Sequence, residues 1–276
     1  MAINKKLIHL SKGENYDIQK ANGNILDSSI CFIQDRKTIV THETEYKTQT
    51  WGYLDFPPNG IYAVKADGFF TDASRADSTC KGVALIMGPH HFMIEKTEDY
   101  SSITDIYLWE DPIRDTSLPN IKKVGGGKTT TYSYLYEDGT GLNRDWTTWI
   151  EPDTALGDFN GKSNSKVLEM PTGNPKNIGY CLSEFNRGIY GNNQGYSNWY
   201  IPSCGQMGLV IVYKNEINEM MTLIGGTKFV KTSYWTSTEY AKADAWYVNF
   251  WDNSVGMYTS NKDNLTEFRV RFVKDL

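Results

Sequence analysis

The last third of the chain constrains the fold most strongly, because its side chains alternate with the period of a β-strand. Successive residues of a strand point to opposite faces of a sheet. In the run AWYVNFW from 245 to 251, Trp246, Val248 and Phe250 therefore share one face, which we expect to lie in the core. The closing run EFRVRFV repeats the pattern, with a core face formed by Phe268, Val270 and Phe272.

A helix is expected in the run NIGYCLSEFNRGIYG, where apolar side chains recur at helical spacing and Gly191 can end the helix. The apolar positions are Cys181, Leu182, Phe185 and Ile189. The four cysteines of the chain are widely separated and form no CxxC pair, which argues against a zinc site and favours buried free thiols. Whether Cys181 pairs with Cys204 stays open.

A second helical region begins after Pro202. Ser203 and Gln206 have the spacing of a capping box, which predicts a helix through about Tyr213. A shorter helix is expected from Asn215 to the glycine pair 225–226, with an inward face formed by Ile217, Met220, Met221 and Ile224.

The first part of the chain indicates short strands. Ile30 and Phe32 on one side of a turn-prone segment, and Ile39 and Val40 on the other, predict a β-hairpin. We therefore expect a small N-terminal β unit over residues 1–48 that anchors or oligomerises the protein, and a main domain over 49–276. An ordinary hairpin packed on the main domain is the alternative for the N-terminal residues. In the main domain Asp67-Gly68 is a hairpin signal. The stretch 115–176 is rich in turn residues, which predicts long surface loops.

Several segments, taken in order, resemble one known family. They are WYIPS at 199–203, a helical run, YWTSTEY from Tyr234, AWYVNFWDN from Ala245 and the final RVRFV. This order resembles the C-terminal half of the C-type-lectin-like variable proteins of diversity-generating retroelements, from gut bacteria or their phages, which share their fold with formylglycine-generating enzymes. GxYxVxxDGxxT followed by GVALI is similar to the opening strands of that family, so the resemblance spans about 51–276. The segment DFNGKSNSKVL is similar to one that precedes the family's first helix.

The resemblance implies an α+β fold of the C-type-lectin-like type, with two main helices and short antiparallel strands after a small β-hairpin unit. It also implies a binding protein that displays a diversified surface, such as a receptor-binding protein of a phage tail tip or a cell-surface adhesin. Two alternatives stay open, a carbohydrate-binding adhesin and an enzyme of the formylglycine-generating type. That enzyme uses a pair of cysteines close to the C-terminus, whereas this chain has none after Cys204.

The resemblance places the ligand-binding surface in the segments 240–244, 247, 249, 251–254 and 257–265, at one end of the fold. The expected site residues are Tyr240, Ala243, Asp244, Tyr247, Asn249, Trp251, Asn253, Tyr258, Thr259 and Asn261. In the family this region is rewritten by adenine-specific mutagenesis, and most of these residues are compatible with such an origin. Lys242, Trp251 and Met257 are not, and a fixed polar loop of a non-diversified relative is the alternative.

Charge and hydropathy limit the partners. The formal net charge is −5 and no basic stripe is present, which argues against nucleic acid as a partner. No segment approaches 18 apolar residues, and the first 17 residues contain no signal-peptide core, so we expect neither membrane insertion nor export. The expected partner is a protein or glycan receptor on a host or neighbouring cell, and the expected location is a phage virion or the cytoplasm.

No motif indicates a cofactor, a metal or a catalytic residue. GGGKTTT from 125 lacks the first glycine of a phosphate-binding loop, because Lys122 stands there. His90 and His91 are expected on opposite faces of a strand, which does not suit a shared metal. Calcium-dependent lectins use Glu-Pro-Asn and Trp-Asn-Asp segments close together, whereas the similar tripeptides at 151–153 and 251–253 lie far apart here.

Overall fold

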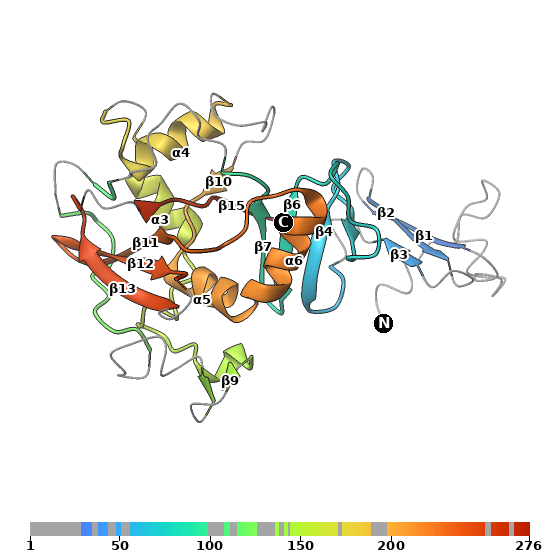
Figure 1. Ribbon diagram of the computed structural model, residues 1–276, viewed down its shortest axis with the longest axis horizontal. Coiled ribbons are helices and arrows are strands. Elements are labelled where there is room, and N and C mark those ends of the chain that lie inside the picture. The colour runs from blue at the N-terminus through green and yellow to red at the C-terminus, as the bar shows by residue number, and fades with distance from the viewer. Residues whose placement is uncertain are drawn as a thin grey trace.

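The protein has a mixed α+β fold, as the sequence predicts, with its strands and helices interleaved around two main sheets (Figure 1). The computed structural model describes residues 29–34, 38–43, 48–50, 56–98, 108–110, 115–125, 136–137, 141–142, 144–170, 173–188, 198–251, 255–264 and 268–276. Everything below refers to these residues.

The larger sheet has six strands, and each neighbouring pair in it is antiparallel. In spatial order they are β10 (Trp199–Tyr200), β15 (Val273–Asp275), β7 (His90–Glu95), β6 (Gly82–Met87), β4 (Gly60–Val64) and β5 (Phe70–Thr71). The β4–β5 hairpin predicted at Asp67-Gly68 is confirmed, because Lys65 N–H donates to the Phe69 carbonyl at 2.9 Å and Gly68 has a φ of 91°. The last strand, β15, lies between β10 and β7, so the C-terminus is built into this sheet.

The second sheet has four strands and contains most of the predicted site residues. In spatial order they are β13 (Gly256–Asn261), β12 (Asp244–Asn249), β11 (Ser233–Ala241) and β14 (Phe268–Arg269). β12 pairs in antiparallel fashion with both β11 and β13, whereas β14 runs parallel to β11. The strands are therefore not all antiparallel, in contrast to the expectation from the sequence.

Short strands form two smaller sheets. β1 (Ser29–Gln34) pairs with β2 (Thr38–Glu43), and β2 pairs with β3 (Thr48–Thr50). The predicted N-terminal hairpin is therefore confirmed, with Phe32 opposite Val40. The assignment of 1–48 as a separate unit stays a prediction. β8 (Tyr136–Glu137) pairs with β9 (Gly141–Leu142), and one turn of 3-10 helix, η3, spans Trp146–Thr148.

Four α-helices lie in the described part of the chain, so the expectation of two main helices is too low. They are α3 (Gly161–Leu168), α4 (Ile178–Asn186), α5 (Cys204–Val212) and α6 (Lys214–Ile224). The last three match the predicted helical runs. The capping box is present, because the Ser203 N–H donates to Oε1 of Gln206 at 3.0 Å, and Gly225 ends α6 with a φ of 69°. Ile189 and Gly191 lie outside the described residues.

The helix α3 contradicts the prediction of continuous loops from 115 to 176. Its sequence, GKSNSKVL, begins with glycine and has few strong helix formers, so propensity and periodicity gave no signal. Tertiary hydrogen bonds hold it instead. Ser165 Oγ accepts from the Ile201 N–H at 2.8 Å, and the Asn164 amide donates to Asp158 at 2.9 Å.

Two apolar clusters pack on opposite faces of both main sheets. Val248 and Phe250 belong to the cluster that contains α5 and α6, whereas Trp235 and Phe272 belong to the cluster that contains α4. Figure 1 shows α4 and α5 on opposite sides of β11 and β12. The core faces predicted from strand alternation are confirmed, because all six apolar residues of the two runs are buried. Strands in both main sheets therefore pack against apolar side chains on both faces.

The three described cysteines, Cys80, Cys181 and Cys204, are buried free thiols, so Cys181 does not pair with Cys204. Burial raises the pKa of Cys204 to about 12 and also raises the pKa of Cys181. Since the thiolate is the reactive form of cysteine, a raised pKa disfavours reaction of either thiol in the folded protein.

Candidate functional site

The predicted site residues gather on three neighbouring strands. Tyr240 lies near the end of β11, Ala243 and Asp244 at the turn into β12, and the others on β12, on β13 or just beyond β12. Figure 1 shows β11, β12 and β13 together at one end of the molecule. Asn253 lies outside the described residues. The structure therefore brings the other nine residues to one region, as the resemblance implies.

These nine residues divide between the two faces of the sheet. On one face Tyr247 lies opposite Tyr258, with ring centroids 5.8 Å apart, and it also packs on Phe268 at 4.4 Å. On the other face Tyr240 packs edge-on against Trp246 at 5.5 Å, and Thr259 pairs with Trp246 across the strands. The two aromatic pairs therefore lie on opposite faces of the sheet, Tyr247–Tyr258 on β12 and β13 and Tyr240–Trp246 on β11 and β12.

Exposure differs among the aromatic residues. Trp251, just after β12, is 51% exposed and is one of the most exposed large apolar side chains described. Tyr240, Tyr247 and Tyr258 are half-buried. Burial, followed by the neighbouring Tyr258, raises the pKa of Tyr247. Each of the three tyrosines thus keeps part of its side chain exposed, while the rest is buried.

Two residues in the loop predicted as surface are in fact core residues. Met257 is 2% exposed and Lys262 is 0% exposed. The Lys262 ammonium pairs with Glu239 and with Glu110, at 3.3 Å in the latter case, and lies 4.5 Å above the centre of the Trp109 ring. The run SNKDN looks like a solvated loop, and no pattern in the sequence marks its lysine as buried.

This ion-pair cluster fixes the turn that follows β13. The Lys262 N–H donates to the Ala243 carbonyl at 2.9 Å, and the Lys262 carbonyl accepts from the Trp109 N–H at 3.0 Å. Trp109 in turn donates through its indole to the Thr236 carbonyl at 2.7 Å. Because these contacts join three distant parts of the chain, the backbone beneath the predicted surface has little freedom to move.

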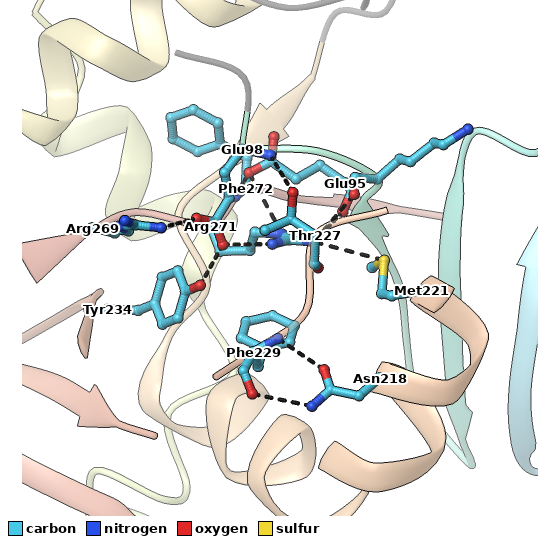
Figure 2. Close-up of polar contacts among 11 residues, drawn as sticks. Glu95, Glu98, Asn218, Met221, Thr227, Phe229, Tyr234, Arg269, Arg271 and Phe272 are labelled. Carbon is cyan, nitrogen blue, oxygen red and sulfur yellow. Dashed lines mark hydrogen bonds and ion pairs between the residues drawn. The ribbon is translucent and has the colours of Figure 1, made fainter. Parts of the chain in front are cut away.

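A second charged network fixes the other end of the sheet. The fully buried Arg271 donates to Glu98 at 2.6 Å and to the Thr227 carbonyl at 2.8 Å, and Figure 2 shows these side chains together. Arg269 and the Tyr234 hydroxyl reach the same Glu98 carboxylate (Figure 2). Burial, and next the Glu98 charge, raise the pKa of Tyr234 well above its usual value. The network ties β11 and the last strand region to the loop after α6.

A polar pocket of about 500 Å³ opens beside the end of β11. Its floor contains three buried polar side chains, Asp158, Asn164 and Glu239, and its rim contains Lys122 and Lys123. Asp158 accepts hydrogen bonds from the Thr238 hydroxyl at 2.7 Å and from the Asn160 N–H at 2.9 Å. The sequence singled out the 158–168 segment only as family-like, so the pocket itself was missed.

The structure also bears on the predictions made for metal ligands and for His90 and His91. No group of three or more His, Cys, Asp or Glu side chains in the described residues is arranged to hold a metal ion. Asp153 lines the polar pocket, whereas residues 252 and 253 of the second lectin-like tripeptide are not described. His90 stacks on Phe159 at 3.7 Å and His91 packs near Phe56 at 4.1 Å, which confirms that they face opposite sides of β7.

The length and hydropathy of the helices bear on the prediction that the protein does not insert into a membrane. Among the described residues, no helix has the length and hydropathy needed to cross a bilayer.

Comparison with known proteins gives a weak structural match and no match in sequence. No protein-family model matches the chain, and no curated protein matches it. Among solved structures, it is similar to a fimbrial protein from Bacteroides ovatus ATCC 8483, with a TM-score of 0.40 and 14% sequence identity. The match covers 90% of this chain and 58% of the fimbrial protein, so this chain spans less than two thirds of its length. We draw nothing about fold or function from a likeness at this level.

Proposed function

We propose that this chain is a binding protein of the C-type-lectin-like type, and that it presents the β11–β13 end of its fold to a receptor on another cell. The observation that carries the proposal is the set of partly exposed aromatic side chains on strands that buried ion pairs hold from beneath. Trp251 is half exposed and lies just after β12, the strand on which Tyr247 lies opposite Tyr258 of β13. Binding energy usually concentrates in a few such aromatic anchors among adaptable polar groups.

A fixed scaffold under a changeable surface also supports the proposal. Substitutions of Thr259 or Asn261 touch exposed side chains, whereas Lys262 and Trp109 keep the adjoining backbone in place. This is the property that a retroelement-diversified protein needs, so we include membership of that class, and a place on a phage tail or cell surface, in the proposal. We also propose that the protein oligomerises through residues 1–48.

We favour binding over catalysis because the described cysteines are not activated. Cys181 and Cys204 are buried, and burial raises the pKa of each. An enzyme of the formylglycine-generating type needs reactive thiols, and the sequence has no cysteine after Cys204.

A glycan receptor is supported by one further observation. The polar pocket is lined by Asp158, Asn164 and Glu239, and Tyr240 directly follows Glu239 on β11. Sugars offer hydroxyl groups to such polar atoms and C–H faces to such rings. The carbohydrate-binding adhesin is therefore the second form of the proposal.

The test is a binding assay with the labelled protein on a panel of gut bacterial cells. The wild type, Trp251→Ala and the control Tyr180→Ala are compared, since Tyr180 is a half-buried tyrosine on α4, away from β11–β13. We expect Trp251→Ala to weaken binding by roughly 1–4 kcal/mol and Tyr180→Ala to leave it unchanged. Periodate treatment of the cells that removes binding indicates a glycan, and protease treatment that removes it indicates a protein. Equal binding by both variants contradicts the proposal.

A further inference from the structure

A second cavity, of about 520 Å³, lies away from the predicted site, between the start of β4, the η3 turn and α6. Figure 1 shows α6 beside β4 and at a distance from β13. No predicted site residue lines this cavity. Its walls combine carboxylates, aromatic rings and an apolar floor, which is the composition of a small-molecule site.

The charge of the cavity is negative. Asp145 on the η3 side and Glu216 and Glu219 on α6 supply three carboxylates, against the single guanidinium of Arg144. Arg144 is already paired with Glu216 and lies 5.4 Å from the centre of the Tyr213 ring. An anionic ligand would therefore meet a neutralised arginine and two further carboxylates, so the cavity favours a cation.

One carboxylate oxygen in the wall lacks a donor. Oε2 of Glu216 is shielded from water and has no hydrogen-bond partner among the described residues, although Oε1 of the same group pairs with Arg144. A buried acceptor without a donor costs free energy, and a ligand N–H placed there would recover it. Glu219 lies one turn further along the same face of α6.

The aromatic and apolar walls define the rest of the ligand. Trp146 and Tyr213 supply the aromatic rings of the lining, and Ile61, Met87 and Met220 supply its apolar side chains. Trp146 is held edge-on by His90, with ring centroids 5.0 Å apart. Burial is the main cause that raises the pKa of Tyr213, so its ring is neutral at ordinary pH. Neutral aromatic faces attract organic cations, and the apolar lining can bury an alkyl chain.

We propose that this cavity binds an alkylammonium ion, and that a linear aliphatic diamine fits it best. One ammonium group would donate to Glu216 and Glu219 on α6, and the other would lie near Asp145 at the start of η3. The alkyl chain between them would lie on Met87 and Met220. The same chemistry is offered by the side chain of a lysine in a peptide, which the experiment distinguishes.

The experiment titrates the full chain with 1,5-diaminopentane, with its neutral isostere 1,5-pentanediol, and with the peptide Gly-Gly-Lys-Gly-Gly, using calorimetry and ligand-observed NMR. We expect the diamine to bind, the diol to bind at least about tenfold more weakly, and added salt to weaken diamine binding. Tighter binding of the peptide than of the diamine would overturn the choice of a free diamine. Equal binding of diamine and diol, or no binding of either amine, would overturn the proposal.

The matched variants are Glu219→Gln and Glu169→Gln, which change the net charge equally. Glu219 lines the cavity, whereas Glu169 is an exposed residue at the end of α3. We expect Glu219→Gln to weaken diamine binding by roughly tenfold, the value of one charge-assisted hydrogen bond, and Glu169→Gln to leave it unchanged. Both positions are exposed, so both variants should fold, and a melting curve verifies this. Equal effects of the two variants would mean that the diamine is attracted only by the net charge of the protein, which would contradict binding in this cavity.

Discussion

Replacement of Lys262 by methionine tests the scaffold beneath the predicted surface. The Lys262 ammonium is fully buried and pairs with two carboxylates that are themselves buried, those of Glu239 and Glu110. Methionine keeps most of the side-chain volume and removes the charge together with the hydrogen bonds that the ammonium donates to Glu239 and Glu110. Removal of one partner from a buried ion pair usually costs about 3–5 kcal/mol, because the remaining charges are left without compensation. We expect Lys262→Met to lower the free energy of unfolding by roughly that amount.

Urea unfolding followed by fluorescence measures this loss. The control is Lys242→Met, since Lys242 is exposed and lies 3.6 Å from the exposed Asp115, and such a pair contributes about 0–1 kcal/mol. The double variant Lys262→Met with Glu239→Gln should lose much less than the sum of the two single variants, because it removes both charges of one pair. A loss below about 1 kcal/mol for Lys262→Met, or simple additivity, would refute the reasoning.

Three further outcomes follow from the structure. Trp246→Ala should cost roughly 3–5 kcal/mol in urea unfolding as a large-to-small core change, and a loss near zero would place its side chain outside the core. Burial alone would raise the pKa of Asp275, but hydrogen bonds from Lys162 and Tyr200 outweigh it and hold the pKa below its usual value. The stability gained from this lowered pKa is present above the unfolded-state pKa of about 3.9 and is lost as pH falls through the folded-state value. Tyr200→Phe should therefore destabilise the protein at pH 7 and by less at low pH, and an equal loss at both would argue against the Asp275 linkage. Cys204 should resist maleimide labelling in the folded protein, as judged by peptide mass mapping, and react once urea unfolds it; rapid labelling of the native protein would contradict its burial.

Strand alternation and capping predicted the elements whose signals are local. The core face of β12 follows from period-2 alternation at Trp246, Val248 and Phe250, and the start of α5 follows from Ser203 and Gln206. The structure confirms both predictions. They could be made from the sequence because the residues that define each element lie within a few positions of one another. The end of α6 at Gly225 was predictable for the same reason.

The features that were missed depend on partners distant in sequence. α3 has no apolar stripe, and it is held by Ser165 through its bond to Ile201, which lies 36 residues further on. Lys262 is buried by Glu110, which lies 152 residues away, and nothing in its neighbourhood indicates this. Strand alternation placed Arg271 on the face opposite Phe272, but it did not show that Arg271 forms a buried ion pair with Glu98.

The binding role of the candidate site stays a prediction, whereas the exposure expected of its side chains is only partly confirmed. The sequence placed β12 correctly, but β13 (Gly256–Asn261) lies in a run that was expected to be a polar loop, and Tyr240, Tyr247 and Tyr258 are half-buried instead of fully exposed. Tyr247 packs on Phe268 and Trp235, because the sheet is covered on both faces by apolar clusters. Period-2 alternation assumes that one face meets water, and here that assumption does not hold near β11.

The most direct test of the account locates the receptor site within the chain. Binding to cells is measured for the wild type, for the double variant Trp251→Ala with Tyr258→Ala, and for a chain that begins at residue 50. The account predicts that the double variant folds and loses most of its binding, while the shortened chain keeps its intrinsic affinity, with a loss only of any gain that comes from multivalency. Normal binding by the double variant, together with loss of binding in the shortened chain, would place the receptor site in the N-terminal residues and contradict the account.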